Sequence, residues 1–83
     1  MDPIDIETLT PADLTRMAAD FEAAAVRAED AARDGLTAAA DPNESPAARA
    51  LARRCVAIAR RHAADYRAEA AALRSGHLPD SWV

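Results

Sequence analysis

Two long Ala-rich stretches flank the one strong cluster of turn-forming residues in the chain, at 41–46. This cluster, DPNESP, holds two Pro and one Asn. Pro breaks a helix because it lacks a backbone N–H, and Asn readily closes a turn on its own backbone. A short link between helices of matched length is typical of an antiparallel pair. The sequence therefore predicts an all-α fold, an antiparallel two-helix hairpin with helices over about residues 11–40 and 46–75 and a turn at 41–45.

Each predicted helix opens with a hydroxyl residue followed by Pro, at Thr10-Pro11 and at Ser45-Pro46. The hydroxyl can accept from a free N–H of the first turn, and Pro at the first helical position gives up only a donor that had no partner. Gly76 predicts the end of the second helix, because Gly adopts the left-handed conformation that terminates helices. The chain thus divides into an N-terminal arm at 1–9, the hairpin at 10–76 and a C-terminal tail at 77–83.

At about 100° per residue, the apolar residues of each predicted helix gather on one face. In the first helix this inner face comprises Leu14, Met17, Ala18, Phe21, Ala24, Ala25, Ala28, Ala32, Leu36 and Ala39. In the second helix it comprises Leu51, Cys55, Ile58, His62, Tyr66 and Leu73, widened by Ala52, Ala59, Ala63 and Ala70.

Several of these inner residues recur at an interval of eleven, as Leu51, His62 and Leu73 do. An eleven-residue repeat predicts nearly straight helices or a slight right-handed coiled coil. Gly35 falls late in the first helix and indicates either a kink or a point where the two backbones approach closely.

Arginine dominates the polar residues of the second helix, whereas carboxylates dominate those of the first. The arginine face comprises Arg49, Arg53, Arg60, Arg67 and Arg74, flanked by Arg54 and Arg61. Pairs between the two helices can therefore fix their register, although exposed pairs contribute at most about 1 kcal/mol each. The same face also suits an anionic partner such as a nucleic-acid backbone. Against this function stand a net charge of −4, few aromatic residues and no recognisable DNA-binding motif.

The predicted hairpin has few large apolar residues, and two helices leave half of each apolar stripe in water. We therefore expect two hairpins to pair into a four-helix bundle, or one hairpin to dock on a larger protein. The residues expected at this interface are Leu14, Met17, Phe21, Leu36, Leu51, Cys55, Ile58, His62, Tyr66, Leu73 and Trp82.

Few residues are candidates for catalysis or for binding a metal or a ligand. Cys55 is interpreted as a small buried hydrophobic residue, since a reactive thiol needs an open, electropositive setting. His62 is interpreted as a core or interface residue; a metal site with Asp65, Glu69 or Glu29 is the alternative, but the Glu-x-x-His motif of di-iron bundles is missing. The terminal Ser81-Trp82-Val83 has the form of a peptide captured by strand addition, which three residues indicate only weakly. No zinc spacing, phosphate-binding loop or nucleophile–base pairing occurs, so no catalytic residue, metal or cofactor is predicted.

The composition indicates how many domains the chain forms and in which cellular compartment it is expected. With 83 residues the chain forms one domain, and its single Cys cannot close an intrachain disulfide, which favours a reducing compartment. No apolar run suggests a membrane span or a signal peptide, so a cytoplasmic location is expected. Ten basic residues that are all Arg suggest a GC-rich bacterial or phage genome. The hypothesis is a non-enzymatic hairpin that associates with itself or with a larger protein; the alternative function is nucleic-acid backbone binding through the arginine face.

Overall fold

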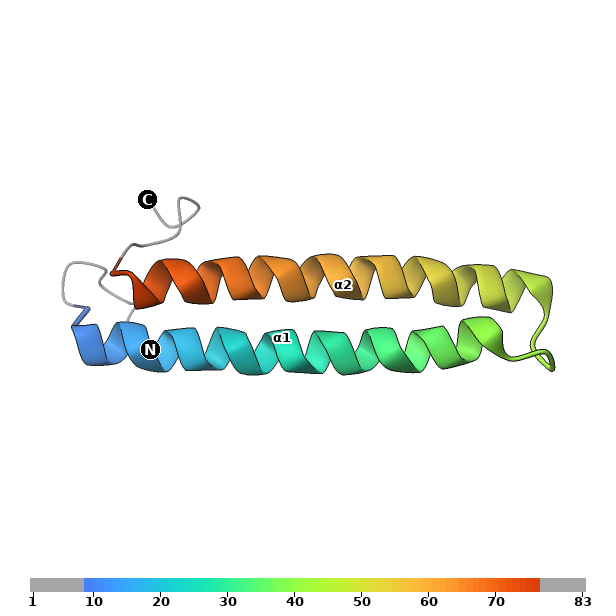
Figure 1. Cartoon of the computed structure of the whole chain (residues 1–83), viewed down its shortest axis with the longest axis horizontal. Coiled ribbons are helices and arrows are strands. Elements are labelled where there is room, and N and C mark those ends of the chain that lie inside the picture. Colours follow the sequence, from blue (N-terminus) through green and yellow to red (C-terminus); the bar gives the residue numbers. More distant parts are fainter. Residues whose placement is uncertain (1–8, 77–83) are drawn as a thin grey trace, which may run out of the picture.

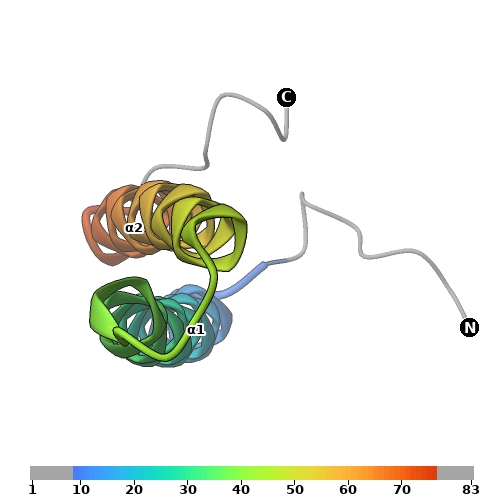
Figure 2. The ribbon, with the colours of Figure 1, turned by 90° about the vertical axis from the view of Figure 1, so that its right-hand side faces the viewer.

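The computed structural model describes residues 9–76, which form two helices joined by one turn. Helix α1 spans Pro11–Ala40 and helix α2 spans Pro46–Arg74. They run antiparallel side by side, with the turn at one end of the rod and, at the other, the start of α1 beside the end of α2, an end of the rod that we call the chain ends (Figure 1). An end view shows a single layer of two helices, which extends 53 × 22 × 20 Å (Figure 2). The predicted helical hairpin is therefore confirmed.

The helix ends are fixed by local hydrogen bonds. Thr10 and Asp13 cap α1 reciprocally, each side chain accepting from the other residue's backbone N–H at 3.2 and 3.0 Å. The Ser45 hydroxyl accepts from the N–H of Ala48 at 3.1 Å at the start of α2. Gly76 ends α2 with φ +81° and donates its N–H to the Leu73 carbonyl at 3.1 Å, as in a Schellman-type helix end.

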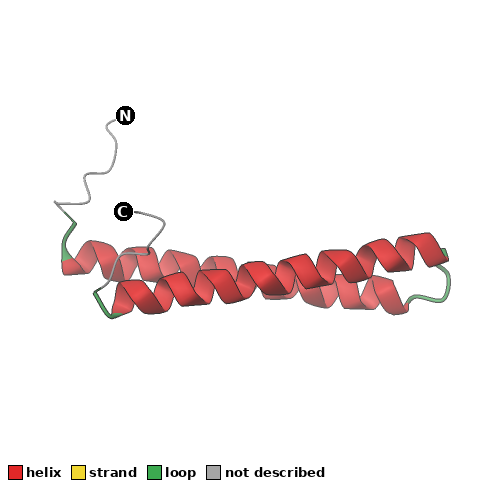
Figure 3. Ribbon diagram, turned by 90° about the horizontal axis from the view of Figure 1, so that it is seen from above, coloured by secondary structure: helices red, strands yellow, loops and turns green. Residues whose placement is uncertain are grey.

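The buried residues recur every seven positions along both helices, apart from Leu73, which follows Ala70 by three. In the described part of the chain they are Ala18, Ala25 and Ala32 of α1 and Val56, Ala63, Ala70 and Leu73 of α2. A seven-residue interval is 3.5 residues per turn, the spacing that keeps a seam between two helices that wind around each other with left-handed sense. Viewed from above, the helices cross at a shallow angle (Figure 3). The predicted eleven-residue packing repeat is therefore wrong.

The large apolar residues of α2 follow a row that crosses this seam obliquely. The row Leu51, His62, Leu73 repeats every eleven residues, so it drifts sideways against a seam that repeats every seven. Leu51 and His62 are exposed, whereas Leu73 is 2% exposed at the far end of the helix. The row thus begins outside the seam near the turn and enters it near the chain ends.

The predicted inner face of the hairpin lies in the seam only in part. Five of its members are exposed to solvent: Leu36, Leu51, Cys55, Ile58 and His62. Small residues replace them in the seam, because α1 and α2 come too close together to accommodate long side chains near the turn. Val56, which the sequence interpretation left out, is buried at 5% exposure instead.

Gly35 lies where the two helices approach each other closely. Helix α1 continues through it without interruption. A Cβ added at Gly35 would lie 2.7 Å from the Val56 Cγ2 atom and 3.5 Å from the Ala52 carbonyl oxygen. The absence of a side chain at position 35 therefore makes room for Val56.

Candidate association surface

One long edge of the hairpin is apolar over most of its length. We define this apolar edge by eight residues from both helices: Met17, Phe21 and Ala24 of α1, and Leu51, Cys55, Ile58, His62 and Tyr66 of α2. The spacing of three or four residues between successive members places them on the same side of each helix. Leu51 is 61% exposed and Ile58 is 53% exposed, values that are high for large aliphatic side chains.

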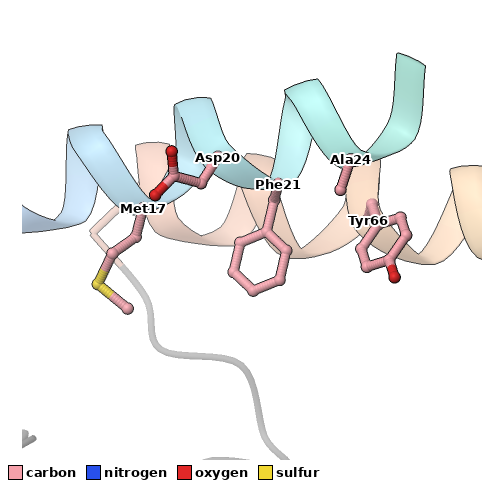
Figure 4. A pocket seen from close by; sticks show the side chains of 5 residues that line it. All are labelled: Met17, Asp20, Phe21, Ala24 and Tyr66. Carbon is pink, nitrogen blue, oxygen red and sulfur yellow. The ribbon is translucent and has the colours of Figure 1, made fainter. Parts of the chain in front are cut away.

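An open hollow at the end of the apolar edge remote from the turn is lined by five residues: Met17, Asp20, Phe21, Ala24 and Tyr66. Figure 4 shows the side chains of Met17, Phe21 and Tyr66 projecting on the same side of the helix pair. The ring centroids of Phe21 and Tyr66 lie 6.1 Å apart across the two helices. The His62 ring continues this line, with its centroid 6.4 Å from that of Tyr66.

The opposite edge is closed by two ion pairs between the helices. Arg74 donates Nε–H and Nη2–H to the two carboxylate oxygens of Glu22, at 2.7 and 2.8 Å. The second pair lies seven residues before Arg74 on α2 and seven residues after Glu22 on α1. There Arg67 donates its Nε–H to the Glu29 Oε1 atom at 3.0 Å. The prediction that pairs of charges link the two helices is confirmed.

These contacts shift the titration of the carboxylates that they hold. The hydrogen bonds from Arg74 lower the pKa of the Glu22 carboxyl below its ordinary value, and Glu22 in turn raises the pKa of the Arg74 guanidinium. The pKa of Asp13 is also lowered, chiefly by the backbone N–H of Thr10 at the start of α1. In their charged form, the Glu22 and Asp13 carboxylates therefore stabilise the folded chain.

The row of arginines along this edge is only half paired. We define the arginine row as Arg53, Arg60, Arg67 and Arg74, which recur every seven residues on α2. Glu22 and Glu29 lie at the matching interval on α1, but the next positions of that series are Leu36 and Asn43. Within residues 9–76, Arg53 and Arg60 have no ion pair.

The predicted arginine face is thereby divided. Arg67 and Arg74 are held by carboxylates of α1. The other five arginines of this face have no ion pair within residues 9–76: Arg49, Arg53, Arg54, Arg60 and Arg61. All five lie in the part of α2 nearer the turn, where α2 carries no acidic residue before Asp65.

The other predicted site residues are placed as follows. Cys55 is exposed, so its interpretation as a buried residue is wrong. His62 is exposed on the apolar edge; among the described residues no three His, Cys, Asp or Glu side chains are grouped to hold a metal ion. Trp82 and the Ser81–Val83 tail lie outside the described residues, as does the arm before Leu9.

The residues expected at an interface fall into three groups. Met17, Phe21, Leu51, Cys55, Ile58, His62 and Tyr66 share the apolar edge. Leu14 and Leu73 belong to the packed cluster between the helices, together with Ala18 and Ala70, and Met17 and Phe21 also pack against it. Leu36 lies on the edge that carries the arginine row, since it follows Glu29 by seven residues. Sequence reasoning missed the pairing of Glu22 and Glu29, which their common interval with Arg67 and Arg74 could have indicated.

Comparison with protein-family models, with curated proteins and with solved structures found no match for this chain. Neither described helix combines the length and the apolar character needed to cross a membrane.

Proposed function

We propose that this protein acts through protein–protein association and that its apolar edge pairs with the same edge of a second copy. The product is a homodimeric four-helix bundle, a cytoplasmic assembly without enzymatic activity. The observation that carries the proposal is the exposure of Leu51 and Ile58 on the same edge that holds the hollow at Phe21 and Tyr66. Full burial of each such side chain contributes about 1.5–3 kcal/mol, and a second copy supplies the same residues again.

The hairpin by itself gains little from its seam. Five of its seven buried apolar residues are Ala, which removes little apolar area from water, and Leu73 is the only Leu among the seven. Ordering each residue of a helix costs about 1–2 kcal/mol of backbone entropy. An assembly that covers the apolar edge supplies burial that the two helices of one chain lack, as in other four-helix bundles.

The borders of the apolar edge differ in charge. Asp20 borders it on α1, where it lines the hollow, and Arg61 borders it on α2 beside Ile58 and His62. A two-fold axis parallel to the helices sets α1 of one copy over α2 of the other, so the apolar residues of one edge cover those of the second edge.

The test is sedimentation equilibrium of the purified chain from about 1 to 100 µM, with helicity followed by circular dichroism. The wild type should sediment at twice the chain mass of 8.8 kDa. Ile58→Glu should shift it to the monomer, because a carboxylate in the middle of the interface cannot be buried without a partner. Val26→Glu is the matched control: Val26 is also exposed, at 50%, but lies outside the apolar edge.

A fully helical monomer at every concentration would contradict the proposal, and so would equal dissociation of both variants. A partial loss of helicity in Ile58→Glu together with dissociation supports it, because folding is then coupled to pairing.

Nucleic-acid binding through the whole arginine face is less well supported. Two of its seven arginines already pair with carboxylates of α1, and the net charge of the chain is −4. Phosphate contacts depend on free cations, so this function rests on the five arginines nearer the turn.

A further inference from the structure

We propose that the open half of the arginine row, Arg53 and Arg60 beside Leu36, is a docking site for an acidic amphipathic helix of a partner protein. This site lies on the edge opposite the apolar edge and does not rest on the homodimer. The partner helix presents two carboxylates seven residues apart, with an apolar residue between them that covers Leu36.

The closed half of the same row shows which chemistry it accepts. Arg67 and Arg74 bind two carboxylates that are themselves seven residues apart on an antiparallel helix. Arg53 and Arg60 continue the row at the same interval, a rise of about 10.5 Å along α2. Two carboxylates seven residues apart on another helix are separated by the same rise, so a second pair of bridges can form without distortion.

What α1 offers at the open half is not a carboxylate. The third position of the series Glu22, Glu29 is Leu36, which is 45% exposed. Val26, which is 50% exposed, lies between Glu22 and Glu29 and therefore belongs to the closed half. The open half therefore combines two unpaired guanidinium groups with exposed aliphatic surface.

This combination favours an acidic helix over a nucleic acid. Guanidinium groups bind carboxylate and phosphate oxygens equally well in geometry, so the arginines do not discriminate. Leu36 does discriminate, because a phosphate backbone gains nothing from an aliphatic side chain, whereas the apolar stripe of an amphipathic helix covers it. Single-stranded nucleic acid would instead call for aromatic residues on which bases stack.

The first experiment measures direct binding by fluorescence anisotropy in low salt. The probe is a synthetic Ala-rich helical peptide with two Glu seven residues apart and Leu between them; a second peptide carries Gln in place of both Glu. The protein should bind the Glu peptide at least about tenfold more tightly than the Gln peptide, as expected for two partly exposed ion pairs. Equal affinity for both peptides, or no binding of the Glu peptide, overturns the proposal.

Two matched double variants locate the site. Arg53→Gln with Arg60→Gln should weaken binding of the Glu peptide about tenfold or more. Arg54→Gln with Arg61→Gln removes the same charge from the neighbouring positions on the outer side of α2 and should change it less than about threefold. An equal loss in both variants overturns the proposal in favour of general attraction to anions. Tighter binding of a single-stranded oligonucleotide than of the Glu peptide overturns it in favour of a phosphate ligand.

A third variant supplies Arg60 with a carboxylate from α1 of the same chain. Leu36→Glu places a carboxylate at the third position of the Glu22, Glu29 series, within reach of Arg60 by the same geometry. It should raise the thermal midpoint of the hairpin and weaken binding of the Glu peptide, because Arg60 is then occupied. Leu36→Gln has a similar size without the charge and should leave the midpoint unchanged. If Leu36→Glu binds the Glu peptide as the wild type does, the proposal is overturned.

Discussion

The two halves of the hairpin are held together by different means. Near the chain ends, Leu14, Phe21 and Leu73 pack around Ala18 and Ala70. Near the turn, the buried positions are Ala32 and Val56, and Gly35 lets the backbones approach. Large side chains fill the seam in the first half, whereas small residues and close contact replace them in the second.

The ion pairs follow the same division. Of the two pairs between helices, Glu22–Arg74 lies toward the chain ends and Glu29–Arg67 lies near the middle of the rod. The half near the turn keeps the arginines of α2 unpaired and its Leu36 and Leu51 exposed. The comparison teaches that the half near the chain ends is built to hold the hairpin, whereas the half near the turn leaves its apolar and charged groups available for other molecules.

The largest expected effect comes from removing the one large buried side chain of the packed half. Leu73→Ala should lower the free energy of unfolding by about 2–4 kcal/mol, because it leaves a cavity in the Ala18–Ala70 cluster. Leu36→Ala, the matched change on the exposed side of the other half, should change it by less than about 0.5 kcal/mol. Urea denaturation followed by circular dichroism measures both, and similar losses in the two variants would erase the distinction between the halves.

The next effect tests the close approach near the turn. Gly35→Ala gains about 1 kcal/mol in helix propensity, yet its Cβ would meet Val56 Cγ2 at 2.7 Å, so we expect a net loss of about 1 kcal/mol. Val56→Ala removes the clashing methyl group. In a double-mutant cycle, the combined variant should therefore be less destabilised than the sum of the two single variants. Simple additivity would show that the backbones separate easily at this point.

The smallest effect comes from the exposed pair at the chain-end half. Because the folded chain lowers the pKa of Glu22, its contribution is present above the pKa of the unfolded chain and is lost as the pH falls through the folded value. Thermal midpoints measured from neutral pH down to about pH 3 should therefore decline less steeply in Glu22→Gln than in the wild type. Arg74→Gln should flatten the curve in the same way, since it removes the hydrogen bonds that lower this pKa. Because the pKa of Asp13 is also lowered, the thermal midpoint of both variants should still fall somewhat in acid. If either variant shows the same slope of midpoint against pH as the wild type, the Glu22–Arg74 pair does not form.

The local features of the hairpin followed from the sequence because each depends on a few neighbouring residues. The capping pair Thr10 and Asp13, the Ser45 cap and the left-handed Gly76 each satisfy backbone groups within one turn. Such signals act before any tertiary contact forms. The division into two antiparallel helices was therefore readable from the chain.

Only the tertiary structure decided which residues line the seam. Ala is spread around both helices, so hydrophobicity gives little contrast, and the larger Leu51 and Ile58 suggested the wrong side of α2 near the turn. The seam follows the small residues at intervals of seven, because helices that approach closely exclude long side chains. Which carboxylates meet Arg67 and Arg74, and which arginines are left unpaired, depends on the register between the helices. That register is a property of the packed pair, and neither helix carries it alone.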